Sequence, residues 1–137
     1  MNEFDQKDRA GFEKLSSTNA SDALDALGYK GSTCGIRPMI ERWNKIVGPA
    51  VTMRMTAAGQ TPQKHHLGMN AIASAKPGDV IVIDNGGRMD TSCWGGILAH
   101  AAQTKGVSGT GNDGCCRGLG DCVGAGYNVF APGALGG

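Results

Sequence analysis

The spacing of apolar and polar positions along this chain predicts both helices and strands. Residues 80–84, "VIVID", form a short apolar run that ends in an acid, which is typical of a buried strand. Residues 65–75, "HHLGMNAIASA", and residues 95–105, "GGILAHAAQTK", carry apolar residues at helical spacing. Gly106 follows the second of these segments, where it is suited to end a helix.

The N-terminal part of the chain predicts helices, and further short elements follow toward the C-terminus. Residues 8–15 indicate a short helix. Residues 16–28, "SSTNASDALDALG", indicate a stronger one, capped by Ser17, Thr18 or Asn19 and closed by Gly28. Residues 45–55 predict a strand broken or bulged at Gly48, residues 85–87 a loop, and residues 107–111 a weak strand. A short helix over 119–126 and a final strand over 127–131 follow, while "PGALGG" adds no closing element.

This alternation of helix and strand predicts an α/β fold. The chain has 137 residues, which is enough for one hydrophobic core, so we expect a single domain over 1–137. Within it we place a helical segment over about 8–28 and an α/β core over about 45–137.

Charge and cysteine content narrow the class of protein. The net charge is +1 and no Lys/Arg run is visible, so nucleic acid is not an expected partner. No apolar run is long enough to cross a membrane, and the charged N-terminus does not resemble a signal peptide. Five cysteines, an odd number without an export signal, favour free thiols in a cytoplasmic protein.

The chain contains 23 glycines, and many of them gather in residues 109–122, "GTGNDGCCRGLGDC". Gly109, Gly111 and Gly114 match the G-x-G-x-x-G pattern of dinucleotide sites. That pattern requires a firm strand before it and a helix that opens inside it. Only Val107 and Ser108 precede the match, so a nucleotide site is not predicted.

The three cysteines of the same segment, Cys115, Cys116 and Cys122, contain no C-x-x-C pair and have no nearby histidine. A structural zinc site needs better spacing, so we interpret them as small core residues.

A glycine pair opens the helix predicted at 95–105. The backbone N–H groups of Gly95, Gly96, Ile97 and Leu98 are suited to hold a carboxylate or phosphate, because nothing blocks approach to a helix N-terminus there. Close packing of the glycines is an equally good explanation of the pair.

Arg117 lies in a glycine-rich turn, and its planar guanidinium is able to bind a carboxylate through two hydrogen bonds. Together with the helix start it suggests an acidic small molecule as ligand. Asp113 and Asp121 nearby could hold a hard cation through oxygen ligands.

Five segments occur in an order and at a spacing that resembles one family: "AKPGDVIVIDNGG", "WGGILAHAAQTKGVSG", "DGCCR", "GYNVFA" and, nearer the start, "STNASDALDALG". This is the family of 4-hydroxy-4-methyl-2-oxoglutarate aldolases and related regulators of ribonuclease E activity. The resemblance implies a swivelling β/β/α domain. Because the family's subunits run on for several more strands, it also implies a C-terminally truncated copy.

The family's hallmark is a glycine or acid, twenty residues, Arg-Asp, two residues, and a final acid. Here Gly96, Arg117 and Asp121 match it, whereas Gly118 stands in place of the metal-binding aspartate. The resemblance implies that Arg117 and the backbone of residues 95–98 bind a pyruvate-like carboxylate. It also implies that an acid, here Asp121, binds Mg²⁺ or Mn²⁺.

The implied activity is a divalent-metal-dependent aldolase or decarboxylase that cleaves 4-hydroxy-2-oxo dicarboxylic acids, and oxaloacetate, to pyruvate. The cation would act as a Lewis acid, and a base would take the hydroxyl proton. The family implies a homotrimer or hexamer. The alternatives are a non-catalytic regulator of ribonuclease E activity and an inactive homologue, both favoured by Gly118.

Overall fold

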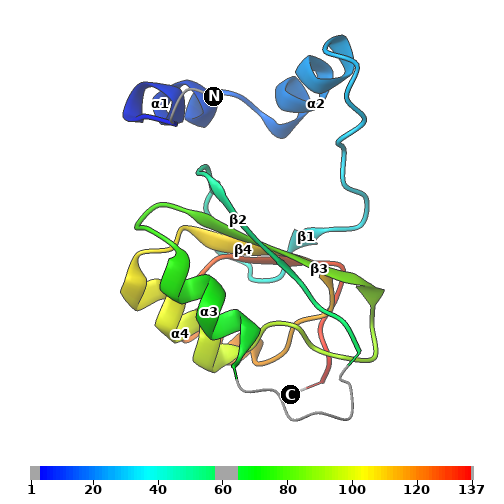
Figure 1. The fold of residues 1–137 in the computed structure, drawn as a ribbon, viewed down its shortest axis with the longest axis vertical. Helices are drawn as coiled ribbons and strands as arrows, with labels where there is room; N and C mark the ends of the chain where they lie inside the picture. Colours follow the sequence, from blue (N-terminus) through cyan, green and yellow to red (C-terminus); the bar gives the residue numbers. More distant parts are fainter. Residues whose placement is uncertain (1–3, 58–64, 137) are drawn as a thin grey trace. The chain divides into compact units, whose positions relative to one another are not determined.

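The computed structural model describes residues 4–57 and 65–136. These form two compact units, residues 1–35 and residues 36–137, which are considered separately. Five helices and five strands are assigned in the described part of the chain, and Figure 1 labels most of them.

The first unit contains two capped helices, α1 (Gln6–Lys14) and α2 (Ser17–Ala26). Asp5 caps α1 and Ser16 caps α2, each in a capping box in which the third helical residue bonds back to the cap. The expected cap of α2 at residues 17–19 is wrong by one position, because Ser16 accepts from the backbone N–H of Asn19. Gly28 adopts the predicted left-handed conformation after α2, with a φ of 80°.

The second unit is a five-stranded sheet with helices packed on it. Its strands lie in the order β1-β5-β4-β3-β2, and all neighbours are parallel except β1 and β5. The strands are β1 (Arg37–Pro38), β2 (Ala50–Arg54), β3 (Val80–Arg88), β4 (Gly109–Gly114) and β5 (Val129–Ala131). Three helices, α3 (Leu67–Ser74), α4 (Gly96–Lys105) and α5 (Leu119–Ala125), connect the parallel strands.

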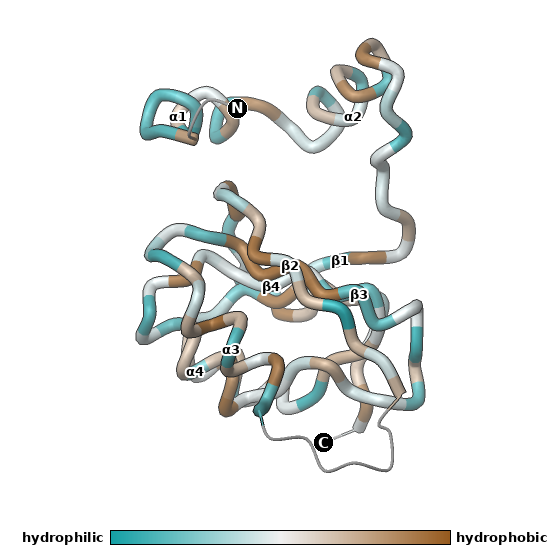
Figure 2. Tube along the Cα trace, in the orientation of Figure 1, coloured by the Kyte–Doolittle hydropathy of each residue, from teal (hydrophilic) through white to brown (hydrophobic). Residues whose placement is uncertain are grey.

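One face of the sheet is buried. Ile81 and Ile83 of β3 point into the core, whereas Val82 between them is 41% exposed. Helices α3 and α4 lie side by side on one face of the sheet in Figure 1. Much of β2 and β3 is coloured hydrophobic in Figure 2. The core continues through Ala99 and Ala102 of α4, whose small side chains let the helix approach the strands closely.

Two expectations about the strands are wrong. Residues 85–87, expected to form a loop, belong to β3, which bulges between Asp84 and Arg88 through two glycines with positive φ before Arg88 pairs with Gly114 of β4. The weak strand expected at 107–111 lies instead at 109–114, in the middle of the sheet. The G-x-G-x-x-G glycines therefore lie within a strand.

Residues 132–136 carry no helix or strand of their own, as expected. They are nevertheless tied to the rest of the unit, because Cys116 forms isolated bridges with Trp94 on one side and Ala134 on the other. The backbone N–H of Leu135 donates to the carbonyl of Cys116 at 2.8 Å. The segment around Cys116 is thereby fixed from both sides just before Arg117.

Candidate functional site

The first turn of α4 presents uncapped backbone amides. Gly95 is the N-cap residue in an extended conformation, with φ −152° and ψ 177°, and no side chain caps the helix. The N–H groups that open an α-helix have no partner within the helix, and the helix dipole adds positive potential there. Among the residues at this helix start, Gly96 and Leu98 are buried and Ile97 is 85% exposed.

The side chain of Arg117 reaches the N-terminus of α4, called the head of α4 below, because the backbone of Arg117 is held next to it. Its N–H donates to the carbonyl of Trp94 at 2.9 Å, next to the Trp94–Cys116 bridge. A Cβ added to Gly95 would lie 3.4 Å from Cγ and 3.5 Å from Nε of Arg117. The arginine side chain therefore runs alongside Gly95 and is exposed, and its guanidinium has no ion pair within the described residues.

Asp121 lies against the same helix start. It belongs to the first turn of α5, and a Cβ on Gly96 would overlap its Cβ and carboxylate, with its Cγ 2.7 Å away. Its side chain is exposed and accepts no hydrogen bond from the residues the structure describes. Arg117 and Asp121 therefore both lie against the first residues of α4, Arg117 at Gly95 and Asp121 at Gly96.

Gly118 is the N-cap of α5 and adopts a left-handed conformation, with φ 65° and ψ 42°. Its carbonyl accepts the backbone N–H of Asp121 at 3.1 Å and of Cys122 at 3.2 Å. Position 118 therefore supplies no side chain, and its carbonyl is already engaged in the first turn of the helix.

A divalent cation bound at the start of α4 would have one carboxylate ligand, that of Asp121. No group of three His, Cys, Asp or Glu side chains suited to a metal occurs within 4–57 and 65–136. Mg²⁺, however, is commonly bound by one or two carboxylates and keeps water and substrate oxygens as its other ligands. The exposed carboxylate of Asp121 fits that role, whereas Asp113 is engaged by the backbone of Gly87 on the neighbouring strand.

The cysteines around the site are buried and free. Burial raises the pKa of Cys116 to about 11, with a further contribution from Cys122. The pKa of Cys122 is raised by burial and by the charge of Asp121. Because the thiolate is the form that attacks substrates and binds metals, these thiols act as the small core residues that the sequence predicted.

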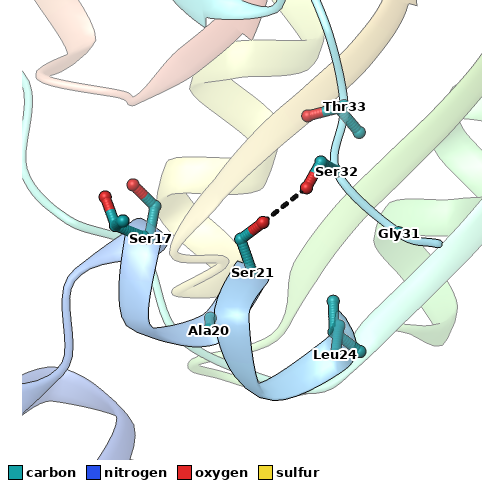
Figure 3. A pocket seen from close by; sticks show the side chains of 8 residues that line it. Ser17, Ala20, Ser21, Leu24, Gly31, Ser32 and Thr33 are labelled. Atoms are coloured by element: carbon teal, nitrogen blue, oxygen red, sulfur yellow. Dashed lines mark hydrogen bonds between the residues drawn. The ribbon is translucent and has the colours of Figure 1, made fainter. Parts of the chain in front are cut away.

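A groove in the first unit is a different kind of feature. It has a volume of about 440 Å³ and lies between α2 and residues 31–33. Figure 3 shows the hydroxyls of Ser21 and Ser32 directed toward each other, and they are 2.6 Å apart. The groove is lined by hydroxyl groups and small side chains without a charge, so nothing in it favours an acidic ligand.

Sequence reasoning missed the way these residues are held together. The carbonyl of Trp94, which orients Arg117, has no sequence signature. The contact between Asp121 and Gly96 joins two helices and is invisible in the spacing of either. The left-handed φ of Gly118 is the one feature with a signal, since glycine is the residue favoured there.

Comparison with known proteins places this geometry in context. A family model described as "RraA-like: Aldolase/RraA" matches residues 17–135. Protein DlpA of Legionella pneumophila is 35% identical over 117 residues, which is 85% of this chain and 19% of that protein. A protein of Halalkalibacterium halodurans named "Putative 4-hydroxy-4-methyl-2-oxoglutarate aldolase" is 32% identical over 122 residues, covering 89% of this chain and 54% of that protein.

A solved structure agrees with the fold. Streptomyces coelicolor RraAS2, described as an unusual member of the RNase ES inhibitor RraA protein family, superposes with a TM-score of 0.79. It shares 26% identity, and the match covers 96% of this chain and 65% of that one. The chain thus spans about half the length of the H. halodurans relative and a fifth of DlpA.

No helix in the described ranges has the length and apolar character needed to cross a membrane.

Proposed function

Since this chain belongs to the RraA-like family, which includes aldolases and ribonuclease regulators, we propose that it is a lyase acting on small 2-oxo acids. Its substrates would be 4-hydroxy-2-oxo dicarboxylic acids and oxaloacetate, and its product pyruvate. The observation that carries the proposal is the packing of Arg117 along Gly95 at the uncapped head of α4.

Two groups of this chain bind the substrate carboxylate. The planar guanidinium of Arg117 is suited to bind it through two parallel hydrogen bonds. The amides at the start of α4 offer further donors and favour negative charge. Since these backbone donors are fixed by the fold, they require little reorganisation when charge develops on the substrate.

Asp121 would hold a divalent cation, Mg²⁺ or Mn²⁺, together with water and the oxygens of the oxo acid. When bound, the cation supplies a Lewis acid for the negative charge that C–C cleavage leaves on the pyruvate half. The contribution of Asp121 is a negative charge at the start of α4. Without a cation, that charge would repel the substrate carboxylate, and this supports a bound cation in the working protein.

The test is pyruvate formation from oxaloacetate with Mg²⁺, with and without chelator, for the wild-type protein and for Arg117→Ala. We expect metal-dependent turnover that the substitution reduces at least about a hundredfold, the scale of losing one charge-stabilising group. Arg42→Ala, which removes an exposed arginine elsewhere in the second unit, is the matched control and should retain activity.

A second function is favoured by one observation, the absence of a side chain at position 118. It is the regulation of a ribonuclease by protein contact, as the description of the S. coelicolor structure suggests for that protein. Turnover no greater than that of Mg²⁺ alone would contradict the lyase proposal and favour this regulatory function.

A further inference from the structure

Asp121 fills a volume that Gly96 leaves open, and Gly118 lies beside it. A Cβ on Gly96 would overlap the side chain of Asp121, closer than real Cβ atoms approach other groups. A Cβ on Gly118 would lie 3.4 Å from Oδ2 of the same carboxylate and 3.1 Å from the backbone nitrogen of Gly96. The three residues come from the start of α4 and the start of α5, so the slot joins the two helices.

We propose that Gly96 is a positioning residue whose missing side chain forms a slot for the side chain of Asp121. A side chain at position 96 would push Asp121 away from the start of α4. The role of the carboxylate as a cation ligand rests on the function proposed above, whereas its placement by Gly96 does not.

A double-mutant cycle, measured as melting temperatures in the absence of metal, tests the slot; it is called the stability cycle below. Gly96→Ala is made in the wild-type protein and in the Asp121→Gly variant, and melting temperatures are compared. We expect Gly96→Ala to lower the melting temperature of the wild-type protein and to lose this effect when residue 121 has no side chain. Asp121→Ala would not serve as the second background, because the Cβ of residue 121 is itself part of the overlap.

Gly120→Ala is the matched control, because a Cβ at this position of α5 meets nothing within 4 Å. It should leave the melting temperature unchanged or raise it. An equal effect of Gly96→Ala in both backgrounds would overturn the proposal.

Mn²⁺ titration followed by electron paramagnetic resonance tests the consequence for the site. We expect Gly96→Ala to weaken Mn²⁺ binding by about 10- to 100-fold, the usual loss when a ligand's support is removed, and Gly120→Ala to leave it unchanged. Wild-type affinity in Gly96→Ala would overturn the positioning role. If the wild-type protein binds no Mn²⁺, the cation of the proposed function is contradicted, and the stability cycle alone decides on the slot.

Discussion

At the scale of single residues, Asn112 lies fully buried on β4, and its amide has no hydrogen-bond partner within the described residues. A buried polar group without a partner costs about 1–3 kcal/mol. Asn112→Val replaces the amide with a side chain of similar size that suits a strand. We expect the free energy of unfolding to rise by about 1 kcal/mol, measured by urea denaturation.

Asn128 is the matched control, because its amide accepts from the backbone of Asn44 and donates to the carbonyl of Ser108. Asn128→Val should lower the free energy of unfolding. A loss of stability in both variants would contradict the assignment of Asn112 as an unsatisfied group.

The thiols give a second prediction at this scale. Cys34 is exposed, whereas the other four cysteines are buried. Burial raises the pKa of Cys93 to about 12, so its reactive thiolate is scarce in the folded protein. We expect an aromatic disulfide reagent at pH 8 to modify one thiol per chain rapidly and the others only after unfolding.

The same pKa predicts a loss of stability at alkaline pH. The unfolded thiol ionises near pH 9 and the folded one near 12, so the contribution of Cys93 is complete below pH 9 and declines above it. Cys93→Ala should weaken the decline in melting temperature between pH 9 and 10.5. Four thiols that react rapidly in the native protein would contradict both predictions.

At the scale of elements, the end of α4 depends on Gly106. This glycine has a φ of 83°, and a Cβ on it would lie 3.2 Å from Cβ of Pro77. We expect Gly106→Ala to lower the free energy of unfolding by about 1–2 kcal/mol, the cost of a left-handed conformation for a residue with a side chain. Thermal or urea denaturation measures the change.

Gly124→Ala, in the interior of α5 with open space around a Cβ, is the control. It should raise stability by about 0.5–1 kcal/mol, because glycine is a poor helix residue. If both substitutions change stability by the same amount, backbone conformation is not what makes Gly106 necessary.

At the scale of the whole molecule, exposed apolar side chains on the helices of the site support assembly into a trimer or hexamer, which we propose. Ile97 of α4 is 85% exposed and Val123 of α5 is 61% exposed. Burial of these two side chains at a contact between subunits would remove apolar surface from water. Sedimentation velocity should find three or six chains per particle, and Val123→Ser should shift the distribution toward smaller species. A monomer at all concentrations would contradict the proposal.

Much of the fold was predictable at this scale, because periodicity marks α3, α4 and the start of β3 independently of one another. The bounds of β4 were not, since its sequence GTGNDG has no apolar pattern. The extension of β3 past Gly86 and Gly87 was not either, since it depends on the pairing of Arg88 with Gly114. In the same way, the sequence identified Arg117 and the head of α4. It could not show Asp121 against Gly96, because that contact depends on how two helices pack.

The shared volume of Gly96 and Asp121 limits how this sequence can evolve. In this chain, a mutation that adds a side chain at position 96 should destabilise the fold less after position 121 has become small, so the order of the two changes matters. Divergent lineages should therefore pair a larger residue at 96 with a smaller one at 121, and this coupled variation would be readable in sequences alone.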